Sequence, residues 1–373
     1  MSSSASLANS ASPRCPVRRE CGGCPWLDES TAAQHAAKLD SLRLALAERG
    51  LDFPEPTLIS AGSSLGYRNR LRLRVDELGS AVFFNPHKLT SCAVLDPVLA
   101  DAVAKLRESG PLRGLLGTRH LELRVADDAR IGLCVYADQV VARSSRAALG
   151  AALPAEWQIG YAGDPRLPRL DYYLEEPVGE PRGTTPLDYQ VPLSSFVQVN
   201  SAVSRALVAR VRGLVRAAGL RSFNDLFCGS GNFSLPLLAD GLDGESVELD
   251  AQAIAALDES AARWRRQGRN HRARVGDARG ASLEPRELLV ANPPRAGLKL
   301  EAGDAQRLAG SATRCVALCS CSPQSLARDL AEFTASGFEL REVTAFDMFP
   351  HTEHLETLAW LERPRAGGSR ESR

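Results

Sequence analysis

The stretch Ser222–Leu238, SFNDLFCGSGNFSLPLL, decides the fold of this chain. A short apolar run leads into a glycine-rich turn and then into a second apolar run, which is typical of a strand, a tight turn and a helix. Asp225, Gly229 and Gly231 have the spacing D-x-x-x-G-x-G. One glycine of such a turn adopts a backbone conformation that other residues avoid, and one lets a ligand approach the main chain. With the positive N-terminus of the next helix, the turn predicts a nucleotide-like cofactor or, alternatively, a purely structural turn.

Strand-like and helix-like patterns alternate on both sides of this turn. Upstream, residues 195–219 predict a helix, with Asn200 or Ser201 as its cap. We expect strands at Ser222–Phe227, Glu245–Leu249, Leu288–Ala291 and Cys315–Cys319. Strands that alternate with helices indicate an α/β fold with a doubly wound, parallel sheet. Two later strand-like runs, FELREVTAFDMF and LETLAWLER, predict a hairpin that adds an antiparallel edge strand to this sheet.

Polar residues follow the predicted strands, and ligands of doubly wound sheets bind beyond the carboxyl ends of the strands. Glu248 ends the second predicted strand, where an acidic side chain binds ribose hydroxyls; a surface carboxylate is the alternative. Asp277 would either lie near an adenine or cap a loop. The sequence Asn292-Pro293-Pro294-Arg295 predicts a stiff loop that holds a planar substrate, with a plain turn as the alternative. Arg295 would then contact a phosphate or a carbonyl group.

The segment LCSCSPQSLARDL contains the best candidate for a nucleophile. Its Ser-Pro pair predicts a helix start, so Cys321 lies just before a helix N-terminus, a setting that favours a thiolate. Cys315 and Cys319 lie inside an apolar strand, where packing is their expected role. Glu356 begins the last predicted strand and is the candidate general base.

Near the N-terminus, the sequence CPVRRECGGCPW indicates a metal centre. Cys15, Cys21 and Cys24 have the spacing C-x5-C-x2-C, and two glycines leave the backbone free to wrap around a metal. Three thiolates need a fourth ligand, and Cys92 is the nearest later cysteine. Four cysteines suit a 4Fe–4S cluster or zinc, with three unligated thiols as the alternative.

A helix over about residues 31–49 is followed by a β-rich module, from about residue 56 to 180. Four arginines, Arg68, Arg70, Arg72 and Arg74, recur at every second position, so in a strand they share one face. Such a stripe is either a phosphate-binding surface or a solvated face. A second alternating run spans residues 120–137.

Bulk composition excludes several classes of protein. The chain has 373 residues, 44% hydrophobic and 24% charged, without an apolar run long enough for a membrane span. The N-terminus lacks a secretory signal, so we expect a cytoplasmic protein without a membrane partner. Because the formal net charge is zero, nucleic-acid binding would depend on local patches. Nine cysteines without an export signal favour metal binding or catalysis over disulfides.

Taken in order, the motifs resemble the RNA uracil-5 methyltransferases, which are class I enzymes that use S-adenosylmethionine to make 5-methyluridine. The match runs from Cys15 to Glu356 and consists of C-x5-C-G-G-C, GYRNRLRL, SFVQVN, DLFCGSGNF, NPPRAG, SCSPQSLARDL and DMFPHTEHLE. The resemblance implies a 4Fe–4S cluster on Cys15, Cys21, Cys24 and Cys92. It implies Cys321 as nucleophile and Glu356 as base. It implies a cofactor site formed by Gln198, Phe227, Gly229, Gly231, Glu248 and Asn292.

Three features favour 23S ribosomal RNA over tRNA as the substrate. Many relatives have Asp where Asn292 stands, and the Asn version is similar to the short, cluster-bearing branch that acts on 23S rRNA. The N-terminal tail is too short for the extra RNA-binding barrel of other cluster-bearing members, and the bacterial tRNA branch typically lacks the cysteines. The alternatives are a tRNA enzyme of the same family, a methyltransferase for a small molecule, and a non-catalytic cluster protein that binds RNA. We expect a monomer.

The resemblance also implies the domain organisation. A disordered tail (1–13) precedes an iron–sulfur segment with its helix (14–55) and a β-rich central RNA-binding domain (56–190). The methyltransferase domain (191–364) has a doubly wound, mostly parallel sheet with a C-terminal antiparallel hairpin. A second disordered tail (365–373) follows.

Overall fold

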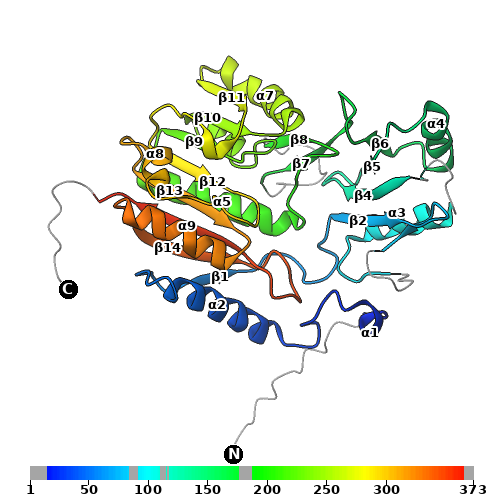
Figure 1. Ribbon diagram of the computed structural model, residues 1–373, viewed down its shortest axis with the longest axis horizontal. Helices are drawn as coiled ribbons and strands as arrows, with labels where there is room; N and C mark the ends of the chain where they lie inside the picture. Colours follow the sequence, from blue (N-terminus) through cyan, green and yellow to red (C-terminus); the bar gives the residue numbers. More distant parts are fainter. Residues whose placement is uncertain (1–14, 84–90, 110–114, 116, 176–186, 365–373) are drawn as a thin grey trace, which may run out of the picture.

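The computed structural model describes residues 15–83, 91–109, 115, 117–175 and 187–364 (Figure 1). The tails predicted to be disordered, 1–13 and 365–373, lie outside the described residues.

An eight-stranded sheet with the order β1-β14-β15-β13-β12-β9-β10-β11 carries the predicted glycine turn. Its strands are β1 (Thr57–Ile59), β9 (Ser222–Leu226), β10 (Asp243–Glu248), β11 (His271–Val275), β12 (Leu288–Ala291), β13 (Cys315–Ser320), β14 (Glu339–Phe346) and β15 (Glu356–Glu362). The neighbours from β11 to β13 are parallel, whereas β15 is antiparallel to both β13 and β14. The prediction of a doubly wound, mostly parallel sheet is confirmed.

Helices cover both faces of this sheet (Figure 1). One face is covered by α5 (Ser201–Ala218), α6 (Ser234–Ala239) and α7 (Ala251–Arg266), and the other by α2 (Thr31–Ala47), α8 (Asp304–Ala309) and α9 (Pro323–Ala335). Alternate residues of the central strands enter the two cores: Leu288 and Val290 pack on one side, Leu289 and Ala291 on the other. Asn200 caps α5, because its side chain accepts a hydrogen bond from the Val203 amide.

The C-terminal hairpin differs from the prediction of an edge strand. β15 lies inside the sheet, between β13 and β14, and β1 forms the outer edge beyond β14. Since Trp360 and its neighbours on β15 are buried on both faces, the strand is unsuited to an edge. The prediction also placed residues 57–59 in the β-rich module, whereas they pair with β14. The edge strand β11 was missed, because its sequence HRARV is polar and partly exposed.

A five-stranded sheet, with the order β3-β2-β4-β5-β6, forms a third core. Its strands are β2 (Arg70–Val75), β3 (Ala81–Val82), β4 (Thr118–Val125), β5 (Ile131–Ala137) and β6 (Gln158–Tyr161). The remaining elements are α1 (Arg18–Cys21), α3 (Pro97–Glu108), α4 (Arg143–Ala152), the 3-10 turn η2 (Ala278–Gly280) and the pair β7 (Arg169–Tyr173) and β8 (Asp188–Pro192). On β2, Leu73 is buried while Arg72 and Arg74 are exposed, as the alternation predicts. Among the described helices, none is long and apolar enough to cross a membrane.

Candidate active site

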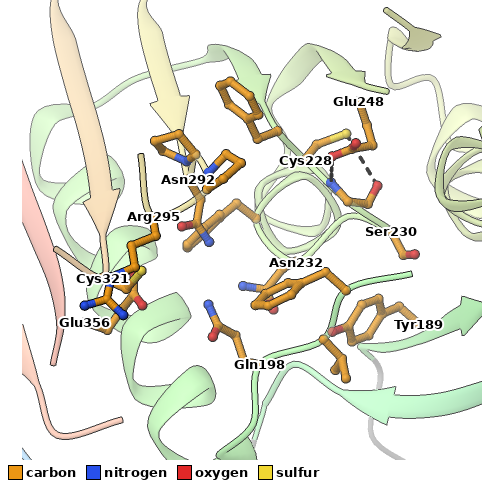
Figure 2. A pocket seen from close by; sticks show the side chains of 17 residues that line it. Tyr189, Gln198, Cys228, Ser230, Asn232, Glu248, Asn292, Arg295, Cys321 and Glu356 are labelled. Atoms are coloured by element: carbon orange, nitrogen blue, oxygen red, sulfur yellow. Dashed lines mark hydrogen bonds between the residues drawn. The ribbon is translucent and has the colours of Figure 1, made fainter. Parts of the chain in front are cut away.

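A cavity of about 500 Å³ lies at the carboxyl ends of β9, β10, β12 and β13 (Figure 2). The structure brings most of the predicted site residues together in its lining: Gln198, Phe227, Gly229, Glu248, Asn292, Arg295, Cys321 and Glu356. Sequence reasoning missed other lining residues, including Tyr189, Phe196, Ser230 and Asn232. Tyr189 lies in β8 and the other three lie in the segments before α5 and before α6, so only the assembled fold places them here.

The two glycines of the turn have different roles. Gly229 has φ +54°, and a Cβ there would meet nothing within 4 Å, so the main chain stays open to a ligand. Gly231 has φ +104°, but its Cβ would lie 2.6 Å from Leu257 and 2.8 Å from Leu235. Gly231 therefore allows close helix packing and does not line the cavity. Phe227 adopts φ 59°, an unusual conformation for a bulky residue, which turns the chain toward the cavity.

Glu248 is held rigidly at one end of the cavity. Its carboxylate accepts hydrogen bonds from the amides of Gly229 (3.2 Å), Leu249 (2.7 Å) and Asp250 (3.0 Å). The surface alternative does not apply, because the side chain lines the cavity. Asp277 instead caps η2 by accepting a bond from the Arg279 amide, so the capping alternative holds for it.

Asp225, the first residue of the D-x-x-x-G-x-G signature, links the two sides of the turn. Its side chain is fully buried and accepts a 2.5 Å hydrogen bond from the Ser234 hydroxyl. Burial raises the pKa of Asp225 to about 7. The residue therefore connects β9 to the start of α6 and does not line the cavity.

Cys321 and Glu356 face each other at the opposite end of the cavity from Glu248 (Figure 2). The β13–β15 register pairs Ser320 with Thr357, so the next two positions along this register are Cys321 and Glu356. Arg295, from the stiff loop after β12, lies beside them. The site thus has one end with a fixed carboxylate and one end with a thiol, a carboxyl and a guanidinium group.

Burial controls the protonation of this thiol end. It raises the pKa of Glu356 to about 8, so this carboxyl is mostly neutral near pH 7. Burial and Glu356 together raise the pKa of Cys321, and Arg295 opposes the shift. The expectation that the helix N-terminus favours a thiolate in the free protein is therefore wrong, because desolvation dominates. Cys315 and Cys319 are buried, as packing residues should be.

A buried polar network, which sequence reasoning missed, holds the loop that leads to Glu356. Lys38 of α2 donates to Asp347 (2.5 Å) and to the carbonyl of Phe349 (3.0 Å). Gln34 donates to the carbonyl of Trp26 (2.8 Å) and accepts from the amide of His351 (2.9 Å). The available signal was a pair of polar residues four apart on the buried face of α2. The network ties the segment after the N-terminal cysteines to the hairpin formed by β14 and β15.

The four predicted cluster ligands lie in one region. Burial and the neighbouring thiols of Cys92, Cys21 and Cys15 raise the pKa of Cys24 to about 11. A cavity of about 610 Å³ is lined by Cys21, Cys24 and Cys92 together with arginines of β2. Within the described parts of the chain, no three His, Cys, Asp or Glu side chains converge tightly enough to hold a metal ion. The iron–sulfur cluster stays a prediction.

The arginine stripe is partly neutralised by a buried carboxylate. Glu122 lies 3.6 Å from Arg72 and 3.8 Å from Arg70, and it accepts a 2.8 Å bond from the buried Arg124. Arg70 also stacks at 5.0 Å over the ring of Phe196, which is 58% exposed beside the active-site cavity. The stripe therefore leads from the second sheet to the mouth of this cavity.

The fold and the geometry of the site indicate the structural class to which the protein belongs. The structure of the Pyrococcus abyssi tRNA (uracil-54, C5)-methyltransferase in complex with S-adenosyl-L-homocysteine is similar, with a TM-score of 0.68 at 19% identity, covering 94% of this chain and 87% of that one. The protein has the fold of a class I S-adenosylmethionine-dependent methyltransferase.

Sequence comparisons show the family. The tRNA (uracil-5-)-methyltransferase family model matches residues 258–364. The 23S rRNA (uracil(1939)-C(5))-methyltransferase of Halomonas elongata is 32% identical, covering 96% of this chain and 78% of the relative. The enzyme of the same name from Thiobacillus denitrificans is 32% identical, covering 95% of this chain and 86% of the relative. The chain belongs to the RNA (uracil-C5)-methyltransferase family.

Proposed function

We propose that the protein methylates C5 of a specific uridine in 23S rRNA, using S-adenosylmethionine as the methyl donor. The observation that carries the proposal is the position of Cys321 opposite Glu356 in a cavity whose far end presents Glu248 and the open turn at Gly229. Methylation of tRNA is the second candidate, since the matching family model and the similar solved structure both bear tRNA names. The full-length relatives named for 23S rRNA favour the first.

The residues at the Glu248 end suit the methyl donor. The fixed carboxylate of Glu248 would hold the ribose hydroxyls of the cofactor, and the open main chain at Gly229 would admit the cofactor beside Phe227. Asn292 and Gln198 lie between the two ends and orient the reacting groups (Figure 2). When bound, S-adenosylmethionine would supply an electrophilic methyl group on a sulfonium, which an activated C5 would accept as the S–CH3 bond breaks and the neutral thioether S-adenosylhomocysteine leaves.

Cys321 activates the base. Uracil C5 is a weak nucleophile, and the Cys321 thiolate adds to C6, so that the C5–C6 π electrons form an enolate toward O4. Arg295 lies beside the thiol, where its positive charge favours the thiolate and the developing enolate. The base reaches this pocket only after it has left its stack in the RNA.

Glu356 completes the reaction. After C5 has gained the methyl group, the Glu356 carboxylate removes the C5 proton, the C5–C6 double bond re-forms, and the Cys321 thiolate leaves. A buried carboxyl with a pKa of about 8 is a stronger base than an exposed one, which suits a weakly acidic carbon.

The test is a comparison of substrates. The purified protein is incubated with S-adenosylmethionine and either 23S rRNA or tRNA from a strain that lacks its gene, and 5-methyluridine is mapped. We expect one modified uridine in 23S rRNA. Modification of tRNA alone would favour the second candidate, and modification of neither RNA would contradict the proposal.

We also propose that Cys15, Cys21, Cys24 and Cys92 hold a 4Fe–4S cluster that shapes the N-terminal segment, without a redox step in methyl transfer. The proximity of the other three thiols to Cys24, and the cavity beside β2 that Cys21, Cys24 and Cys92 line, support this proposal. Bound iron ions would favour the thiolate forms of these cysteines, which burial and the charge of neighbouring thiolates otherwise disfavour. Iron and sulfide analysis after anaerobic purification tests it: four of each per chain are expected, and zinc without sulfide would contradict it.

A further inference from the structure

The loop between β14 and β15, residues 347–355, delivers Glu356 to the active site. Of the described residues after Cys321, only Glu356 lines the cavity. Cys321 and Arg295, which lie near Glu356 in Figure 2, belong to other elements. A displacement of the loop would therefore move the proposed base and leave the nucleophile and the cofactor end in place. The loop is longer than the common hairpin loops of about two to five residues, so contacts outside the hairpin must fix its path.

The carboxyl group of Glu356 depends on its backbone for its position. The residue is 4% exposed, and burial is the only cause of its raised pKa. No charge or hydrogen bond from the described part of the chain contributes to that pKa shift, although either kind of neighbour would alter it. The direction in which the carboxyl points is therefore set by the place where the loop ends.

His351, in the middle of this loop, is held by residues near the N-terminus. It is buried and has φ 66°, a left-handed conformation that residues other than glycine avoid. Its amide donates to Oε1 of Gln34 (2.9 Å), and its carbonyl accepts from the amide of Trp26 (3.1 Å). Burial lowers the pKa of His351, so the ring is neutral and its Nδ1 accepts from Nε2 of Gln34 (3.2 Å). These bonds stabilise a backbone conformation that the loop alone disfavours.

Gln34 of α2 is the residue at which most of these bonds meet. Its Nε2 also donates to the carbonyls of Trp26 (2.8 Å) and Glu29 (3.0 Å). The His351 amide can only donate, so the side-chain oxygen of Gln34 must face it, which fixes the orientation of the Gln34 amide. Lys38, one turn further along α2, holds the start of the same loop. A rigid helix thus anchors the loop at two points.

We propose that Gln34 is a positioning residue for the last step of the reaction, because through His351 it holds the loop where the Glu356 carboxylate can reach the C5 proton. This inference rests on the proposed function. In that step the C5–H bond breaks, its proton moves to Glu356, and its electron pair re-forms the C5–C6 double bond. The C6–S bond breaks, and its electrons return to Cys321. Methyl transfer itself does not use Glu356, so Gln34 controls release of the methylated RNA.

The experiment follows methyl transfer and release separately. Gln34→Met removes the hydrogen bonds at nearly constant side-chain volume, and Gln306→Met, at an exposed position of α8, is the matched control. Each variant is mixed with substrate RNA and methyl-labelled S-adenosylmethionine in a single turnover. Label in the covalent protein–RNA adduct and label in free RNA are then measured under denaturing conditions. Thermal unfolding checks the fold; if Gln34→Met does not fold, Gln34→Glu, which lacks the donor to His351, takes its place with the same expected result.

We expect Gln34→Met to transfer the methyl group at a rate within about twofold of the wild type. Release of free RNA should be roughly tenfold slower, since a misplaced general base loses part of its usual contribution of about 10²–10⁴. The methylated adduct should therefore accumulate in this variant. Gln306→Met should match the wild type in both steps.

Equal slowing of methyl transfer and release would overturn the inference, because a general loss of structure affects both steps. Release at the wild-type rate would also overturn it. If the wild type forms neither adduct nor 5-methyluridine, the proposed function and the inference fail together. If the wild type is active and Gln34→Met gives either of the first two results, only the inference fails.

Discussion

Glu356 is a carboxyl group that the protein buries completely, at a free-energy cost that depends on pH. Burial raises its pKa from the ordinary value of 4.5 to about 8, so folding favours the neutral form. Stability from this group is fully present below pH 4.5 and is lost progressively as the pH rises to about 8.

We predict that Glu356→Gln stabilises the protein at high pH. At about pH 9 the variant should be more stable than the wild type by on the order of a few kcal/mol and should therefore unfold at a higher temperature, and at about pH 4.5 the two should match. Glu77→Gln, at an exposed position, is the control and should change little. Thermal unfolding at both pH values checks this, and a difference that is independent of pH would contradict the assigned cause.

The same burial predicts the pH dependence of catalysis. In the proposed mechanism Cys321 reacts as a thiolate nucleophile and Glu356 as a carboxylate base, so both must lose a proton, and both have raised pKa values. We therefore expect kcat/KM to fall by roughly tenfold for each pH unit below 8 when one group limits the rate. Steady-state methyl transfer to a short RNA checks this, with RNA affinity measured at each pH as the control. A flat profile between about pH 6 and 9 would show that neither group limits the reaction.

The helix α2 and the loop between β14 and β15 form one structural unit, although about 300 residues separate them in sequence. Removing Lys38 leaves the buried Asp347 without its closest partner. We predict that Lys38→Met destabilises the protein by about 3 kcal/mol in denaturant unfolding. The control Lys105→Met removes an exposed pair with Asp101 and should cost less than about 1 kcal/mol.

The double variant Lys38→Met/Asp347→Leu separates a buried charge from a lost contact. It should recover part of the stability, since no unpaired charge then remains in the core. A double variant that is less stable than Lys38→Met would show that the unpaired charge of Asp347 is not the main cause of the instability of Lys38→Met.

The helices and strands that could be predicted are those that a local pattern of apolar and polar residues encodes. The apolar run Leu288–Ala291 and the cap at Asn200 needed no knowledge of the rest of the chain. The interior position of β15 was not predictable from its pattern, because it depends on β1 arriving from residue 57 to cover β14.

The proximity of the two proposed catalytic residues was predictable for a different reason. Cys321 and Glu356 stand at the ends of two strands that the sheet makes neighbours, so a correct topology brings them together. Their protonation was not predictable, since burial by the surrounding loops reverses the expected effect of the helix N-terminus.

Because the molecule as a whole carries no net charge, RNA binding must depend on local groups. We predict that the double variant Arg72→Gln/Arg74→Gln raises KM for RNA several-fold without lowering kcat. It should also reduce the slope of log KM against log salt by about 1.4 if both arginines contact a phosphate, since each phosphate contact to single-stranded RNA contributes about 0.7. Arg43→Gln, on the exposed side of α2, is the control. An unchanged salt slope would favour the alternative of a solvated face.

The formation of a covalent bond between the protein and RNA tests the central claim most directly. Glu356→Gln, Cys321→Ala and the packing control Cys319→Ala are incubated with substrate RNA and S-adenosylmethionine, and the products are separated under denaturing conditions. We predict that Glu356→Gln accumulates a methylated adduct joined through Cys321, that Cys321→Ala forms neither adduct nor 5-methyluridine, and that Cys319→Ala turns over. Turnover by Cys321→Ala at the wild-type rate would contradict the account.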